Sequence, residues 1–167
     1  LRLSYCLIDG IVHGNAESHG VYIDDTPGPV VIEHSKIIAS GINVLVGGGS
    51  PWIPNQRVMS DGFVFRWNEC TKLHEWSKDR GNVGVKNLFE LKNCHYANIY
   101  GNIFTNCWPD NQQGMAILFT PREQNPSQYG KPARPAPLSG MTKVRFHNNL
   151  VTSVAGGIHV LASDDIG

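Results

Sequence analysis

Residues 98–104 read NIYGNIF, and four other stretches share its form: an apolar second residue, a small or amide fifth residue and an apolar last residue. These stretches are residues 2–8 (RLSYCLI), 31–37 (VIEHSKI), 64–70 (VFRWNEC) and 145–151 (RFHNNLV). Their fifth positions recur after 29, 33, 34 and 47 residues (6 to 35, 35 to 68, 68 to 102, 102 to 149). Because repeats of this length stack into elongated architectures, the pattern predicts a solenoid.

A second strand-like piece follows each copy and opens at or near a glycine. The pieces are residues 20–24 (GVYID), 41–45 (GINVL), 88–92 (LFELK), 114–118 (GMAIL) and 157–161 (GIHVL). Successive side chains of a strand point to opposite faces, which predicts that one apolar set faces the core. The opposite, outward stripe is then expected to carry Tyr22, Asn43, Glu90, Ala116 and His159.

Two short strands per unit and no helical periodicity predict an all-β fold, a right-handed parallel β-helix of about five coils. We expect the coils near residues 1–27, 28–57, 58–93, 94–124 and 141–167, in one β-helix segment with less than a quarter of its residues helical. The proline-rich residues 125–140 are expected to form a loop insertion. Both ends read as interrupted coils, so we expect a fragment of a longer chain.

The fifth positions of the repeat predict a structural ladder of hydrogen bonds. Its members are expected to be Ser35, Asn68, Asn102 and Asn149. An inward-turned amide at a bend can bond the backbone of its own turn and the equivalent side chain of the next coil, about 4.8 Å away. Cys6 and Cys70 occupy stacked columns where a small apolar residue would serve, so we expect both to be free thiols in the core.

Composition excludes several classes of protein. Fourteen basic residues balance fourteen acidic ones, so we expect no nucleic-acid partner. The longest apolar runs are far shorter than the roughly 20 residues that span a bilayer, so we expect no membrane partner. Cysteine and histidine spacings do not match metal motifs, and we expect no metal and no cofactor. Calcium is the one ion that Asp24–Asp25 or Asp164–Asp165 could bind, although each pair alone offers few ligands and turn capping explains it better.

The chain resembles right-handed parallel β-helix proteins of the pectin-lyase-like superfamily. The resemblance is closest to secreted bacterial β-helix repeat proteins without assigned activity. It is carried by residues 85–93 (VKNLFELKN), 99–104 (IYGNIF), Trp108 and 114–124 (GMAILFTPREQ). The resemblance implies the fold over nearly the whole chain, but this fold hosts lyases, hydrolases, esterases, epimerases, tailspikes and adhesins. The calcium and basic-residue set of the lyase branch has no residue-by-residue match here.

The densest polar cluster that the pattern builds contains Glu90, Lys92, Arg122 and His159. A carboxylate beside cations could act as acid or base on a glycosidic bond, and these four residues are the candidate catalytic set. The competing interpretation is a solvated sheet face with Glu and Lys paired across coils. Trp76, Asn43 and Tyr22 are candidate substrate-binding residues, since aromatic faces stack on sugar rings. A tryptophan that covers the side of the solenoid is an equally good explanation of Trp76.

Two functions follow from these patterns. The leading hypothesis is binding or degradation of an extracellular polysaccharide along a β-helix face, by a lyase or a glycoside hydrolase if the protein is an enzyme. The alternative is a structural or adhesive solenoid without catalysis, such as a surface fibre or tailspike shaft. Either function predicts a secreted or cell-surface protein.

Overall fold

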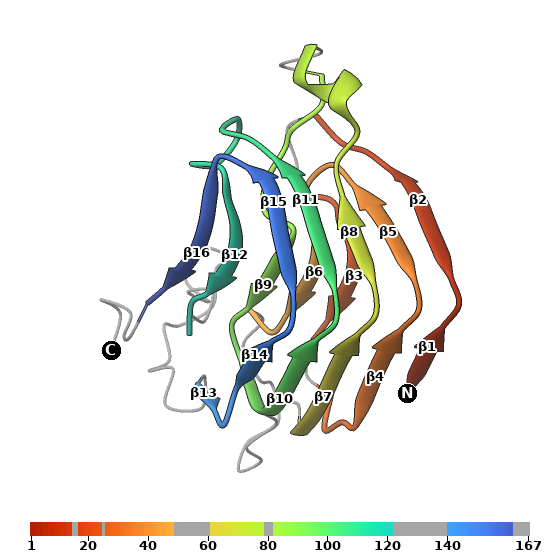
Figure 1. Ribbon diagram of the computed structural model, residues 1–167, viewed down its shortest axis with the longest axis vertical. Helices are drawn as coiled ribbons and strands as arrows, with labels where there is room; N and C mark the ends of the chain where they lie inside the picture. Colours follow the sequence, from red (N-terminus) through yellow and green to blue (C-terminus); the bar gives the residue numbers. More distant parts are fainter. Residues whose placement is uncertain (15–16, 25, 49–60, 79–81, 122–139, 162–167) are drawn as a thin grey trace, which may run out of the picture.

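Parallel strands stacked in three sheets make up the computed structural model, which describes residues 1–14, 17–24, 26–48, 61–78, 82–121 and 140–161 (Figure 1). Sheet A contains β1 (Arg2–Ser4), β4 (Val30–Glu33), β7 (Asp61–Arg66), β10 (Cys94–Tyr100), β13 (Met141–Thr142) and β14 (Arg145–His147). Sheet B contains β2 (Leu7–Ile11), β5 (Lys36–Ala39), β8 (Glu69–Thr71), β11 (Ile103–Cys107) and β15 (Leu150–Val154). Sheet C contains β3 (His19–Ile23), β6 (Ile42–Val46), β9 (Phe89–Leu91), β12 (Met115–Phe119) and β16 (Gly156–Val160).

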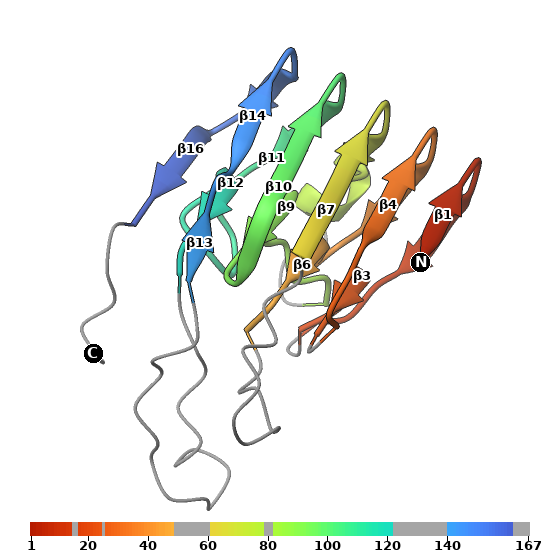
Figure 2. The same cartoon turned by 90° about the horizontal axis from the view of Figure 1, so that it is seen from below.

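The chain visits sheets A, B and C in turn, and each visit lies beside the previous one. Figure 2 shows this for sheet A, where β1, β4, β7, β10 and β14 lie side by side in chain order. Every strand pair in the described residues is parallel, for example β4 with β7 and β7 with β10. The expected all-β solenoid-like stacking is therefore confirmed. The described helical structure is a single 3-10 turn, η1 (His74–Lys78), which confirms the expectation of little helix.

The repeat alignment reproduces the register of sheets A and B. Its second positions lie in one column, which contains Leu3, Ile32, Phe65, Ile99 and Phe146. Its last positions lie in another, which contains Ile8, Ile37, Cys70, Phe104 and Val151. Equivalent apolar residues thus stack coil upon coil. The register confirms both predicted columns.

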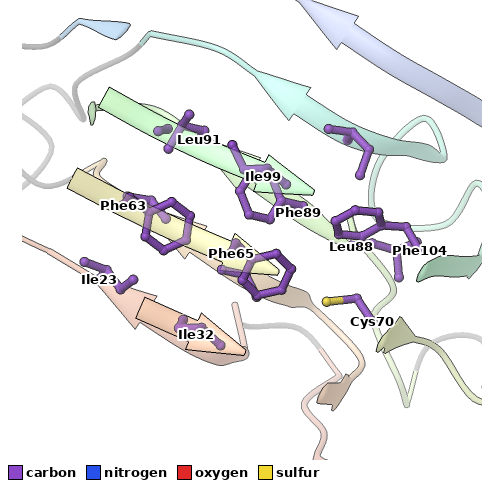
Figure 3. Close-up of a cluster of buried hydrophobic side chains, with 14 of the residues drawn as sticks. Ile23, Ile32, Phe63, Phe65, Cys70, Leu88, Phe89, Leu91, Ile99 and Phe104 are labelled. Carbon is purple, nitrogen blue, oxygen red and sulfur yellow. The ribbon is translucent and has the colours of Figure 1, made fainter. Parts of the chain in front are cut away.

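The three sheets enclose one elongated apolar core (Figure 3). Phe65 is its centre: its ring centroid lies 5.5 Å from that of Phe89 and 6.1 Å from that of Phe104, and all three side chains are buried. Burying one such side chain contributes about 1.5–3 kcal/mol, and aromatic pairs add about 0.5–1.5 kcal/mol. Stacked apolar columns therefore hold the coils together without helices.

The connection between sheets B and C has a smaller apolar cluster of its own. Trp76, on η1, packs there with Ile38, Val83 and Val85. Trp76 is only 6% exposed, so the expectation that it is a sugar-binding platform is wrong. Its indole instead covers the outside of the solenoid at this corner.

The four cysteines are free thiols, and Cys70, Cys94 and Cys107 are buried. The prediction of free thiols at Cys6 and Cys70 is confirmed, although Cys6 is partly exposed. Most of the proline-rich insertion predicted at 125–140 lies outside the described residues. So do Asp25, Asp164 and Asp165.

Candidate functional site

The turn between sheets A and B contains the predicted ladder residues. Asn68 and Asn102 are almost fully buried, and Ser35 is 4% exposed. Asn102 Oδ1 accepts hydrogen bonds from the Asn68 backbone N–H at 2.9 Å and from Asn68 Nδ2 at 3.1 Å. Asn149 Oδ1 accepts the equivalent pair from Asn102 at 3.0 and 2.9 Å. Each coil thus donates to the side chain of the next, with no substrate needed to explain these amides.

Two predicted site residues, Glu90 and Lys92, form an ion pair in which Glu90 is buried and Lys92 is partly buried. Glu90 is 5% exposed; its Oε2 accepts from Asn87 Nδ2 at 3.2 Å and its Oε1 from Thr120 Oγ1 at 3.4 Å. Lys92 Nζ lies 3.3 Å from Glu90 Oε1. The expectation that Glu90 lies on an open face, as acid or base, is wrong because its carboxylate is enclosed by protein partners. A sugar polymer cannot reach an enclosed carboxylate without displacing them.

The outward stripe of sheet C also differs from the expected one. Tyr22 lies in register with Leu45, and Glu90 with Leu118, so Asn43 and Ala116 belong two residues further back. Asn43 is fully buried at the corner with sheet B, and its Nδ2 donates to the carbonyls of Ile37 and Thr71. The expectation that Asn43 binds substrate is therefore wrong.

The other candidates on sheet C are dispersed. Tyr22 is 47% exposed on β3, at one end of the sheet, and stacks on His19. His159 is exposed on β16, at the opposite end, in register with Leu118. Arg122 lies outside the described residues. Sheet C therefore does not bring the predicted catalytic set together on an open face within the described part of the chain.

A different surface gathers aromatic side chains: the outer edge of the turn between sheets A and B. The residue before each ladder position has a positive φ angle, which turns the backbone and points the side chain outward. These residues are Tyr5 (φ 57°), His34 (50°), Trp67 (55°), Gly101 (68°) and Asn148 (53°). Non-glycine residues are uncommon in this region, and here they recur on consecutive coils. We call Tyr5, His34 and Trp67 the ring ridge.

The ring ridge is a continuous stack along the solenoid. The Tyr5 and His34 centroids lie 4.8 Å apart and those of His34 and Trp67 4.7 Å apart. These distances match the coil spacing, so the stack follows from the fold. Tyr5 is 79% exposed and Trp67 45%. Because the rings cover much of each other's faces, the ridge presents ring edges with their N–H and O–H groups.

Charged side chains support the ridge from sheet A. Glu33 is buried and binds both Arg2 and Arg66; Arg66 Nε lies 2.8 Å from Glu33 Oε2. The hydrogen bond from Arg66, followed by that from Arg2, lowers the pKa of Glu33. The Arg66 guanidinium also lies 4.5 Å from the Trp67 ring centroid and donates to the Tyr100 hydroxyl at 2.9 Å. Glu33 thus fixes Arg66, and Arg66 fixes the indole.

A groove of about 530 Å³ runs beside the ridge. Its lining consists of Tyr5, His34, Ser35, Lys36, Trp67, Asn68, Glu69, Gly101 and Ile103. Lys36 Nζ and Glu69 Oε1 form an ion pair at 2.9 Å on the sheet B side. Gly101 is required here, because a Cβ would approach Trp67 Cδ1 to 2.7 Å. This open, shallow groove therefore combines aromatic edges with a charged pair.

Sequence reasoning missed the ridge, although a signal existed. The fourth position of the repeat carries a ring in three consecutive copies, at Tyr5, His34 and Trp67. That column has no apolar periodicity, and its outward direction depends on the positive φ angles. Only the stacked coils make the three rings neighbours.

Comparisons with known proteins identify no relative. A scan of protein-family models, a search of curated proteins and a search of solved structures each found no match. Among the described residues, no three His, Cys, Asp or Glu side chains gather closely enough to hold a metal ion. The same part of the chain forms no helix with the length and apolar character of a membrane span.

Proposed function

We propose that this protein binds an extended polysaccharide in the groove beside the ring ridge. The observation that carries the proposal is the exposed stack of Tyr5, His34 and Trp67 along the solenoid, with the Lys36–Glu69 pair facing it. Sugar rings have apolar faces and polar rims, and they bind where aromatic groups and hydrogen-bonding side chains meet. A linear polymer matches a linear, repeating surface.

The groove offers several kinds of contact to a sugar. The ring edges of the ridge supply N–H and O–H groups, while Lys36 and Glu69 supply a donor and an acceptor for hydroxyl groups. Exposed Leu7, Ile103 and Leu150 extend the surface with apolar area on sheet B. Ring contacts repeat on three consecutive coils, about 4.8 Å apart. Repetition favours a polymer over a small ligand, because each further sugar residue adds similar contacts.

We propose binding without catalysis at this surface. Glu90, the candidate acid or base, is enclosed, and Glu33 is held by two arginines. Inverting hydrolysis needs two carboxyl groups about 6.5–9.5 Å apart across an accessible bond. The described part of the groove contributes Glu69 as its carboxylate, already paired with Lys36. The degradative half of the hypothesis therefore loses its support here, and the binding half keeps it.

The fold context of the proposal is a right-handed β-helix of five coils. Parallel crossover connections are right-handed in nearly all proteins, and the five-copy repeat supports the coil count. A relation to the pectin-lyase-like superfamily stays a prediction from the sequence. A polysaccharide ligand also supports a secreted or cell-surface location.

Affinity electrophoresis tests the proposal. The protein is run through gels that contain one polysaccharide each, from a panel of neutral and acidic polymers, and its retardation gives a dissociation constant. We expect wild type to be retarded by at least one polymer, and Trp67→Ala and Tyr5→Ala each to weaken that binding about tenfold, since anchor aromatics often dominate affinity. Tyr22→Ala is the matched control, because it removes an exposed tyrosine from sheet C.

Circular dichroism confirms that the variants stay folded. Binding that survives loss of Trp67 and Tyr5 but not of Tyr22 would move the site to sheet C. A wild type that binds no polymer in the panel would leave the structural or adhesive solenoid as the better function.

A further inference from the structure

A second groove lies on the outer face of sheet A, where the backbone bulges in consecutive coils. Gly62 (φ 79°), Tyr96 (φ 58°) and Lys143 (φ 54°) occupy matching positions between paired residues of β7, β10, β13 and β14. Glycine adopts this conformation at no steric cost, whereas tyrosine and lysine do not. The two large side chains stand at a position where the backbone alone would favour glycine.

The groove at this bulge has a volume of about 460 Å³. Its lining consists of Tyr96, Ala97, Asn98, Lys143, Val144 and Arg145. The Lys143 amine lies 4.2 Å from the Tyr96 ring centroid and donates to the hydroxyl of that residue. Arg145, on β14, lies in register with Asn98 on β10, and its exposed side chain therefore lies on the same outer face of sheet A as that of Asn98. The groove thus presents a lysine and an arginine side by side.

The charge of this groove is uncompensated within the described part of the chain. No described carboxylate forms an ion pair with Lys143 or Arg145, whereas Arg2, Arg66, Lys36 and Lys86 all have carboxylate partners. The described carboxylates of sheet A are Glu33, which binds two arginines, and Asp61, at the start of β7. A groove with two cations that have no described carboxylate partner suits an anionic group, and the arginine fork matches planar anions such as a carboxylate through two parallel N–H groups.

Polar rings connect this groove with the ring ridge. His147 Nε2 lies 3.1 Å from Asn98 Oδ1, and its ring stacks on Tyr100 with centroids 5.2 Å apart. Tyr100 meets Trp67 edge to face at 5.8 Å. Asn98 and Tyr100 are two residues apart on β10, about 7 Å along the strand. A chain of a few sugar residues can therefore cross sheet A from Trp67 over Tyr100 and His147 to Arg145.

We infer that the polysaccharide is acidic, and that Lys143 and Arg145 bind a carboxylate of a uronic acid residue in the groove of sheet A. This inference rests on the proposed function, since it names the class of the polymer that binds at the ring ridge and continues into this groove. Arg145 binds the carboxylate through two parallel N–H groups, and Lys143 contributes a second charge. Tyr96 holds the lysine amine at the groove through its ring and hydroxyl.

The test compares polymers that differ only in charge. Alginate, polygalacturonate and hyaluronate are each paired with their own carboxyl-reduced form, and dissociation constants are measured at low and high salt. We expect wild type to bind at least one acidic polymer about tenfold or more tightly than its reduced form. Arg145→Gln and Lys143→Gln should each weaken binding of the acidic polymer about tenfold and leave the reduced form unchanged. High salt should weaken only acidic binding, because it screens exposed charges.

Lys86→Gln is the matched control. Lys86 lies on the connection between β8 of sheet B and β9 of sheet C, outside both grooves, and it is paired with Glu17. We expect its affinity for the acidic polymer to stay within about twofold of wild type. The inference would be overturned if wild type bound the acidic and the reduced polymer equally, or if Arg145→Gln left the affinity for the acidic polymer unchanged. The proposed function would still stand in that case if Trp67→Ala weakened binding of both polymer forms. A wild type that binds neither form of any pair would overturn the inference, and the proposed function would fall with it only if the full panel of neutral and acidic polymers also gave no binding.

Discussion

Replacing Asn102 by leucine tests whether the hydrogen-bond ladder holds the coils in register. Asn102 is 1% exposed and makes four side-chain hydrogen bonds to three partners. Its Oδ1 accepts from the Asn68 backbone N–H and Nδ2, and its Nδ2 donates to the Phe65 carbonyl at 2.9 Å and to Asn149 Oδ1. Leucine has the same branched side-chain skeleton with methyl groups in place of the amide oxygen and nitrogen, so it removes all four hydrogen bonds.

The magnitude follows from the groups left behind. Asn68 Nδ2 keeps its bond to the Ile32 carbonyl, and Asn149 Oδ1 keeps the Asn102 backbone N–H. The Asn68 backbone N–H and the Phe65 carbonyl lose their side-chain partner in a dry turn, at about 1–3 kcal/mol each. Burial of the leucine offsets part of this cost, about 1 kcal/mol. We expect a net loss of about 1–5 kcal/mol in the free energy of unfolding, centred near 3 kcal/mol, which is a large share of the 5–15 kcal/mol typical of a protein.

Urea denaturation followed by circular dichroism measures this loss. With a slope of about 1–3 kcal/mol per molar urea, the midpoint should fall by roughly 1 M or more. Asn111→Leu is the control, because its exposed amide makes a single long bond of 3.4 Å to the Gly14 carbonyl. We expect its effect to stay within about 0.5 kcal/mol. An Asn102→Leu midpoint equal to wild type, with an unchanged slope, would refute the reasoning, since the amide column would then be solvated.

Three further predictions concern buried and paired groups. Lys72→Met should destabilise by about 3 kcal/mol, because the buried Lys72 amine donates to the carbonyls of Ala39, Gly41 and Asn87. Burial lowers the pKa of Lys72 from 10.5 to about 7. Between these pH values the unfolded chain binds more protons than the folded one, so folding becomes more favourable as the pH rises. Urea titrations from pH 7 to 10.5 should therefore show that the stability of wild type rises relative to that of Lys72→Met. The close contact with His19 Nε2 at 3.5 Å, followed by the hydrogen bond from Lys86, lowers the pKa of Glu17 to about 2. Wild type should therefore lose stability relative to Glu17→Gln as the pH falls from about 4.5 to 2. An identical acid profile for both proteins would exclude this contribution. A thiol reagent should modify Cys6 first in the native protein, because burial raises the pKa of Cys70, Cys94 and Cys107; rapid native-state labelling of all four thiols would contradict the described core.

The repeat alignment predicted sheets A and B well for a simple reason. Two apolar columns keep a constant spacing from the ladder position in every copy of the repeat. One column runs from Leu3 to Phe146, and the other runs from Ile8 to Val151. Only two residues, the first with a positive φ angle, separate the two strands from each other. A turn of constant length preserves the register, so one alignment predicts both sheets.

Sheet C lies beyond connections of unequal length, and there the alignment failed. The predicted strands were aligned on their opening glycines, Gly20 and Gly41, but these two glycines do not pair in the sheet. His19, the residue before Gly20, pairs with Ile42, the residue after Gly41, so the true register differs by two residues. An error of two residues keeps each side chain on its face but changes its neighbours, so Asn43 was placed beside Tyr22 where Leu45 lies. Spacing from a glycine therefore cannot replace the hydrogen-bonded register.

The sequence by itself determined the class of fold, the ladder amides and the apolar columns, because each depends on residue types that recur at nearly constant spacing. Only the tertiary structure decided which polar residues meet solvent. It enclosed Glu90 with Asn87, Lys92 and Thr120, and it stacked Tyr5, His34 and Trp67 into an exposed ridge. The physical reason is that exposure depends on what covers a side chain across coils, and partners 29 to 34 residues apart become neighbours only when the coils stack.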